Sequence, residues 1–113
     1  MDNIDCYRNL IKEYITEYAA IVRRQPTEGI ETLTLFDETN DQYSIIDVGW
    51  NQGKRKRVIF LLVRIKNGKV WIEDDWTQDG LGNILVEAGV PKEDIVLAFL
   101  SPREREMSEF AIA

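Results

Sequence analysis

The dipeptide Asn67-Gly68 constrains the fold of this chain more than any other feature, because it joins two segments with the composition of β-strands. Asn and Gly tolerate the positive φ angles that both central residues of a type I′ turn require. The segment before it, Lys54 to Lys66, contains the apolar run Val58 to Val63, which is typical of a central strand covered by a helix on at least one side. We therefore predict a long antiparallel hairpin whose second strand is Lys69 to Asp75.

Further strands are predicted on both sides of this hairpin. Ile30 to Phe36 and Gln42 to Trp50 are rich in branched and aromatic residues, and Asn51-Gln52-Gly53 is a turn signal that leads into the hairpin. Towards the end of the chain, Ile95 to Leu100 is predicted to be a short buried strand. The apolar ending from Phe110 to Ala113 is either a strand against the sheet or a dimer contact.

Two helices complete the predicted fold. Apolar residues from Ile4 to Val22 recur every three or four positions, which indicates a long helix with one buried stripe. Thr77 is expected to cap a second, shorter helix from Gln78 to Ala88, which Gly89 would end. We therefore expect residues 1–113 to form a single α+β domain, in which both helices pack on a mostly antiparallel sheet built around the long hairpin.

The composition argues against the common forms of catalysis. The chain has no histidine and a single cysteine, Cys6, so catalytic triads and zinc sites lack their usual residues. Its seven glycines form no phosphate-binding loop. A weaker hypothesis, a metal-dependent enzyme, would use the carboxylates of Glu73, Asp74 and Asp79. We expect a protein that is not an enzyme and needs no cofactor.

Charge and hydropathy narrow the choice of partners. The net charge of −6 disfavours a broad, non-specific grip on nucleic acid. No apolar run reaches the roughly 18 residues that a membrane span needs, and the opening residues are polar, so we expect a cytoplasmic protein without membrane contact. A homo-oligomer is expected, because a short chain with a sheet leaves strand edges to cover.

The run Lys54-Arg55-Lys56-Arg57 is the main basic feature of the chain. On a strand, these four side chains divide between the two faces. Our first interpretation is that they pair with the acids at the end of the hairpin's second strand, Glu73 to Asp75. The alternative is a basic two-stranded ribbon that contacts DNA directly.

Three segments together resemble one known family. They are Asp47-Val48-Gly49-Trp50, the stretch from Val63 to Ile72, and the stretch from Leu85 to Leu97. In combination they are similar to the XisI family, the fdxN-element excision controlling factors of cyanobacteria. The resemblance covers nearly the whole chain, from a first helix at Tyr7 to Tyr18 to the apolar ending.

The resemblance implies a small α+β protein that is needed, with a recombinase, for programmed excision of a DNA element. It implies a nuclease-like companion, XisH, as the direct partner, with recombinase and DNA reached indirectly. Positions that match the family pattern are Gly49, Trp50, Arg64, Gly68, Trp71, Gly89, Pro91, Asp94 and Ile95. Of the polar and aromatic residues, we expect Trp50 and Arg64 to form one recognition surface for a protein partner, with Trp76 as a further contact.

Overall fold

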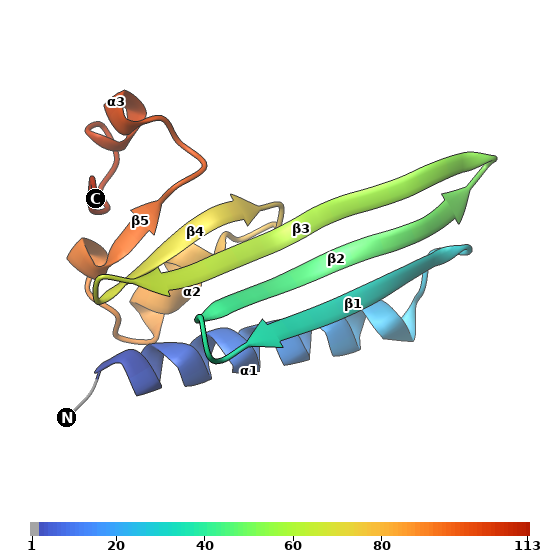
Figure 1. Cartoon of the computed structure of the whole chain (residues 1–113), viewed down its shortest axis with the longest axis horizontal. Coiled ribbons are helices and arrows are strands. Elements are labelled where there is room, and N and C mark those ends of the chain that lie inside the picture. The colour runs from blue at the N-terminus through green and yellow to red at the C-terminus, as the bar shows by residue number, and fades with distance from the viewer. Residues whose placement is uncertain (1–2) are drawn as a thin grey trace.

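A twisted five-stranded sheet forms the centre of the computed structural model, which describes residues 3–113 (Figure 1). Its strands are β1 (Ile30–Asp37), β2 (Gln42–Asn51), β3 (Lys54–Lys66), β4 (Lys69–Asp75) and β5 (Ile95–Leu97). They lie in the order β1-β2-β3-β4-β5, so β3 is the central strand, as predicted. The first four strands are antiparallel, and β5 runs parallel to β4. The predicted α+β fold is confirmed.

Two hairpin turns set the register of the central strands. Asn67 and Gly68 have φ angles of 54° and 77°, as a type I′ turn between β3 and β4 requires. Gln52 and Gly53 adopt nearly the same angles, 52° and 74°, between β2 and β3. The turn predicted at Asn51 to Gly53 is therefore a two-residue turn, and Asn51 itself ends β2.

Helices α1 (Asn3–Arg24) and α2 (Leu81–Glu87) cover one face of the sheet. The 3-10 turn η1 (Lys92–Asp94) precedes β5, and the short helix α3 (Pro102–Arg105) follows it. The predicted stripe of α1 is buried at Tyr7, Ile11 and Ile15. These side chains pack with the inner face of the sheet and with α2, in a core that includes Tyr43, Ile45, Leu61, Val63, Ile72, Leu81, Leu85 and Ile95. None of the helices within residues 3–113 is both long and apolar enough to cross a membrane.

A polar cluster fastens α1 to the turn between β1 and β2. The Arg8 guanidinium donates to both carboxylate oxygens of Asp41, at 2.7 and 3.1 Å, and the Tyr43 hydroxyl donates to the same carboxylate at 2.8 Å. These hydrogen bonds lower the pKa of Asp41, and the bond from Arg8 has the largest effect. Burial and the neighbouring Asp41 raise the pKa of Tyr43 to about 12. The cluster therefore fixes the angle of the long helix against the sheet.

The second helix begins later than predicted, and Thr77 does not cap it. Helix α2 starts at Leu81 after Gly80, whose φ is 79°. Thr77 instead donates through its backbone N–H and its hydroxyl to Asp75, and the other Asp75 oxygen accepts the Leu81 N–H at 2.6 Å. The Asp75 carboxylate thus fixes the loop between β4 and α2, because it binds Thr77 near the start of the loop and Leu81 at its end.

The chain after β4 also departs from prediction in its later part. The predicted strand from Ile95 to Leu100 ends at Leu97, although the Ala98 N–H still donates to Ile72 of β4. Helix α3 was not predicted, but Ser101 and Glu104 form the capping box that starts it. Of the two hypotheses for the apolar ending, pairing against the sheet is observed: Ala111 forms a parallel bridge with Val96.

The opposite face of the sheet is covered only in part. The C-terminal segment reaches it at β4, where the Arg105 guanidinium lies 5.7 Å from the ring centre of Trp71. No helix lies over the remainder in Figure 1, where α1 runs along the other side of β1 to β3. The register places two rows of residues on this remainder: Leu33, Ile46 and Ile59, and Leu35, Ser44 and Leu62. We call this surface the open face.

Candidate functional site

The outer parts of β2 and β3 form a projecting arm, which we define as residues 46–59. In Figure 1 its turn reaches past the end of α1 along the long axis of the molecule. Every residue of β3 from Lys54 to Ile59 is exposed, whereas the second half of the strand alternates between buried and half-buried positions. Strand β1 pairs with β2 only as far as Gly49, so residues 50–54 extend beyond it as a two-stranded end that is open to contact from several sides.

Aromatic and basic side chains gather at the end of this arm. Trp50 and Arg55 are directly opposite in the register, and the Arg55 guanidinium lies 5.8 Å from the centre of the indole ring. Trp50 is 60% exposed. Lys54, Lys56 and Arg57 form no ion pair within residues 3–113. We call Trp50 together with Lys54 to Arg57 the tip.

The prediction that these basic residues pair with acids across the hairpin is wrong. Strand β4 pairs with β3 only from Leu61 to Lys66, so its acidic end stops level with Leu61 and Leu62. Opposite Lys54 to Arg57 lie Asn51 back to Val48, a stretch without a carboxylate. No ion pair within residues 3–113 neutralises the positive charge of the tip, although Glu31 of β1 lies in the same cross-strand row as Val48 and Arg57.

Trp50 and Arg64 do not form one surface, contrary to prediction. Arg55, the cross-strand partner of Trp50, is nine positions before Arg64 on the same strand, which corresponds to about 30 Å. Arg64 instead lies opposite Trp71 and approaches Glu73 at 3.5 Å. The Lys66 ammonium lies over the indole of Trp71, with Nζ 4.2 Å from the ring centre. The structure thus separates the predicted residues into two regions.

Trp76, which the sequence analysis named as a further contact, lies in a third region. It lines a hollow of about 170 Å³ together with Phe99, Asp74 and Asp75. Trp76 is 70% exposed and Phe99 is 50% exposed. We call this feature the Trp76–Phe99 hollow. Phe99 was missed because it was assigned to a buried strand, whereas it lies beyond the end of β5.

The carboxylates in this part of the chain do not converge on a metal. Within residues 3–113 no group of three or more Asp, Glu, Cys or His side chains is arranged to hold a metal ion. Asp75 binds Thr77 and Leu81, and Glu73 lies beside Arg64. The predicted alternative of a metal site at Glu73, Asp74 and Asp79 therefore lacks its ligand geometry.

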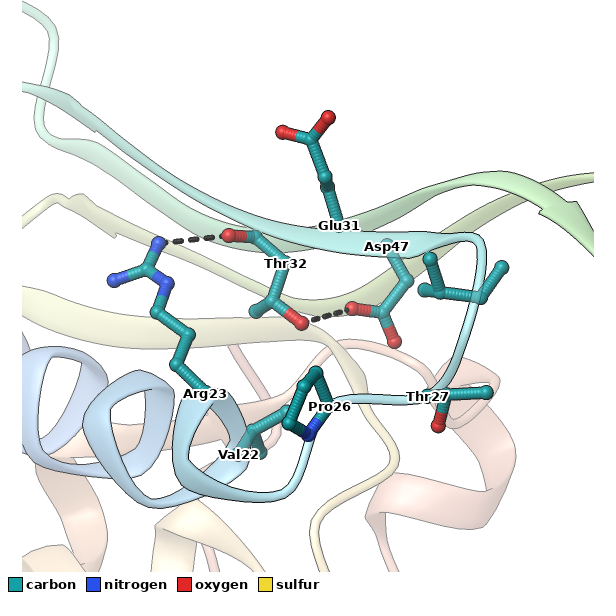
Figure 2. A pocket seen from close by; sticks show the side chains of 8 residues that line it. Val22, Arg23, Pro26, Thr27, Glu31, Thr32 and Asp47 are labelled. Carbon is teal, nitrogen blue, oxygen red and sulfur yellow. Dashed lines mark hydrogen bonds between the residues drawn. The ribbon is translucent and has the colours of Figure 1, made fainter.

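A second hollow, of about 240 Å³, lies between the end of α1 and β1 (Figure 2). Asp47 and Thr32 border it, and the Thr32 hydroxyl donates to Asp47 at 2.8 Å. Arg23 donates to the Thr32 carbonyl at 2.7 Å, while Glu31 points away from the hollow in Figure 2. The polar groups of Arg23 and Thr32 are engaged with one another or with Asp47, so this hollow serves to join α1 to the edge of the sheet.

Comparison with known proteins assigns the chain to a family. A family model described as XisI protein matches residues 1–112. The chain belongs to the XisI family. The resemblance seen in the sequence is therefore confirmed over almost the whole length.

Two solved structures of XisI proteins show the same fold. One, the fdxN element excision controlling factor XisI from Anabaena variabilis, is 38% identical, with a TM-score of 0.85, 95% of this chain and 96% of that chain covered. The other, a XisI-like protein from the same organism, is 30% identical, with a TM-score of 0.86 and the same coverage. Among curated proteins, no match was found.

Proposed function

We propose that this XisI protein is an accessory factor in the excision of a DNA element and that it acts by binding, not by catalysis. Its similarity to a structure named as an fdxN element excision controlling factor, at 38% identity over 95% of the chain, supports this role. The absence of histidine from the sequence supports a non-enzymatic role, since the commonest general base is missing.

The partner in this proposal is an XisH-type, nuclease-like protein, which the tip contacts. The observation that carries the proposal is the exposed Trp50 with Arg55 above its ring, in a run of cations that form no ion pair within residues 3–113. Tryptophan and arginine are the residues most enriched at the centres of protein interfaces. A companion with an acidic surface would complete the charge balance that the chain itself leaves open. Arg64 and Trp76, on separate regions, are proposed as additional contacts.

Direct binding of the tip to DNA is a second candidate. The specific observation in its favour is the lack of acids directly opposite Lys54 to Arg57 on β2, because cations at the end of a projecting hairpin suit a groove of duplex DNA. Four phosphate contacts would give a slope of about −3.6 for log K against log salt concentration. The net charge of −6 limits such contact to the tip.

The test compares both partners with the same variants. Calorimetric titration of the XisH-type companion into the wild type, Arg55→Glu and the matched control Arg103→Glu measures protein binding, and gel retardation of element-end duplex measures DNA binding. Arg103 is exposed on α3 and changes the net charge equally. We expect Arg55→Glu to weaken companion binding about thirtyfold, as for an interface centre, and Arg103→Glu to leave it unchanged.

Absence of any heat of binding between wild type and companion would overturn the leading proposal. Salt-sensitive retardation of the duplex that Arg55→Glu abolishes, without companion binding, would establish the second candidate instead.

A further inference from the structure

The open face of the arm is apolar where a solvated antiparallel sheet is ordinarily polar. The row at its centre consists of Leu33, Ile46 and Ile59, and Ile59 is 45% exposed. Leu35 and Leu62 continue the apolar surface towards β4. Contiguous exposed apolar surface of this kind marks an interface.

The two ends of this apolar surface differ in charge: Arg55 and Arg57 outnumber Glu31 at one end, and Asp74 lies at the other. At one end is the tip, where Trp50 and Arg55 lie on the open face, since Ile46 and Trp50 are an even number of positions apart on β2. At the other end, Asp74 pairs with Leu62 and so lies on the same face, beside Trp76 and Phe99. The side chain of Asp74 makes no hydrogen bond or ion pair within the described residues.

The distance between these ends suits a two-fold arrangement. Arg55 and Leu62 are seven positions apart on β3, which corresponds to about 23 Å. The midpoint falls between Val58 and Ile59, at the apolar row. A surface with a cationic end, an apolar centre and an anionic end is complementary to its own image turned end over end.

We propose that two copies of this chain associate through the open faces of their arms, so that the tip of each lies in the Trp76–Phe99 hollow of the other. The two-fold axis crosses the sheets at the row of Leu33, Ile46 and Ile59. Strand β3 of one copy then lies over β3 of the other in the opposite direction. Arg55 of each copy then approaches Asp74 of the other, which lies on β4, the strand next to β3.

Several features favour a second copy as the occupant over an unrelated protein. The charge of the occupant must be positive at the hollow and negative at the tip, and this chain supplies both at the required separation. Trp76 and Phe99 form no ring contact with each other or with another ring of residues 3–113, so their faces are available to a cation. Glu73 is already paired with Arg64, which leaves Asp74 as the free anion at this end of the open face.

The proposal goes beyond the proposed function, and it can be tested without companion or DNA, since neither takes part in it. Its test is a charge exchange. Arg55→Glu reverses the tip, and Asp74→Lys reverses the hollow, so a pair of identical variant copies brings like charges together at both contacts. A mixed pair restores opposite charges at both, because the altered tip meets the altered hollow and the native tip meets the native hollow.

Sedimentation velocity on the full chain gives the mass of each sample, with circular dichroism to confirm folding. We expect the wild type and the control Arg103→Glu to have twice the mass of one copy, each exchange variant alone to have the mass of one copy, and their equimolar mixture to return to twice that mass. Ile59→Glu, at the axis, should also have the mass of one copy.

Three outcomes would overturn the proposal. They are a wild type that stays a single copy throughout the accessible concentration range, exchange variants that each associate like the wild type, and an equimolar mixture that stays single. Variants that fail the folding check are replaced by Arg55→Gln and Asp74→Asn, each of which should raise the dissociation constant of the pair at least tenfold. Unchanged constants in both would equally overturn it.

Discussion

Gly49→Ala is expected to destabilise the outer part of the arm, next to the tip, through a collision that no side-chain movement relieves. A Cβ atom at this position would lie 1.9 Å from the carbonyl oxygen of Gly29 and 3.1 Å from the Cα of Ile30. The same Gly29 carbonyl accepts the Trp50 N–H at 3.0 Å. Since both colliding groups belong to the backbone, β1 must move away from β2 and that hydrogen bond must break.

The expected cost follows from two contributions. The φ of Gly49 is 149°, and holding a non-glycine residue in such a region costs about 1 to 3 kcal/mol. Loss of one backbone hydrogen bond adds about 1 kcal/mol. Together they reduce the free energy of unfolding by about 2 to 4 kcal/mol, out of a total of roughly 6 to 17 kcal/mol for a chain of this length.

Gly53→Ala is the matched control, because its φ is also positive, at 74°, while nothing lies within 4 Å of an added Cβ. It should cost about 1 to 2 kcal/mol from backbone strain alone. Urea unfolding at equal protein concentration, followed by circular dichroism, measures both variants. If Gly49→Ala is destabilised no more than Gly53→Ala, the close approach of the two strands does not act as the structure indicates.

Three further perturbations probe how α1 is held against the rest of the fold. Asp41→Asn should lower stability at neutral pH by about 1 to 2 kcal/mol. Hydrogen bonds from Arg8 and Tyr43 lower the pKa of Asp41, so its contribution to stability is present above the unfolded pKa of about 3.9 and is lost as pH falls below that value. The free energy of unfolding, measured with urea at several pH values, should therefore fall less steeply at acid pH in the variant than in the wild type. Burial and a hydrogen bond to Asp94 raise the pKa of Tyr7 to about 12, so stability should fall as pH rises from about 10. The fall should be less steep in Tyr7→Phe, and equal slopes of Tm against pH in the two proteins would contradict this. Ile15→Ala, at a fully buried position, should cost about 3 to 4 kcal/mol and lower Tm by more than 10 °C, roughly 4 °C per kcal/mol, by differential scanning calorimetry.

Local patterns were sufficient to predict most of the elements. Asn67-Gly68 determines a turn by the φ angles of two residues, and the buried stripe of α1 follows from spacing along one helix. The end of β5 and the start of α2 depend instead on contacts made elsewhere. Helix α2 starts only at Leu81 because Asp75 binds Thr77 and Leu81, and a carboxylate in a strand gives no local sign of that role.

Which residues share a surface depends on the register between strands, and part of that register could be deduced from the sequence. The hairpin prediction contained strands of thirteen and seven residues. A shorter strand that begins at Lys69 cannot reach Lys54 to Arg57, so their lack of acidic partners could have been deduced from length alone. The adjacency of Trp76 and Phe99 could not, because it arises from the parallel pairing of β4 with a strand more than twenty residues later in the chain.

The tip takes part in both proposals, and this makes them interdependent in a measurable way. A tip that lies in the hollow of a second copy cannot contact a companion or DNA at the same time, so association of two copies competes with binding of the anionic partner. The apparent affinity for that partner is then reduced by the fraction of chains that remain single. Raising the concentration of the wild type should weaken apparent binding per chain, whereas Asp74→Lys, with an intact tip and no pairing, should bind at least as tightly at every concentration. Concentration-independent affinity in the wild type, together with confirmed association, would show that the tip is not the shared contact and would place partner recognition at Arg64 or elsewhere on the body.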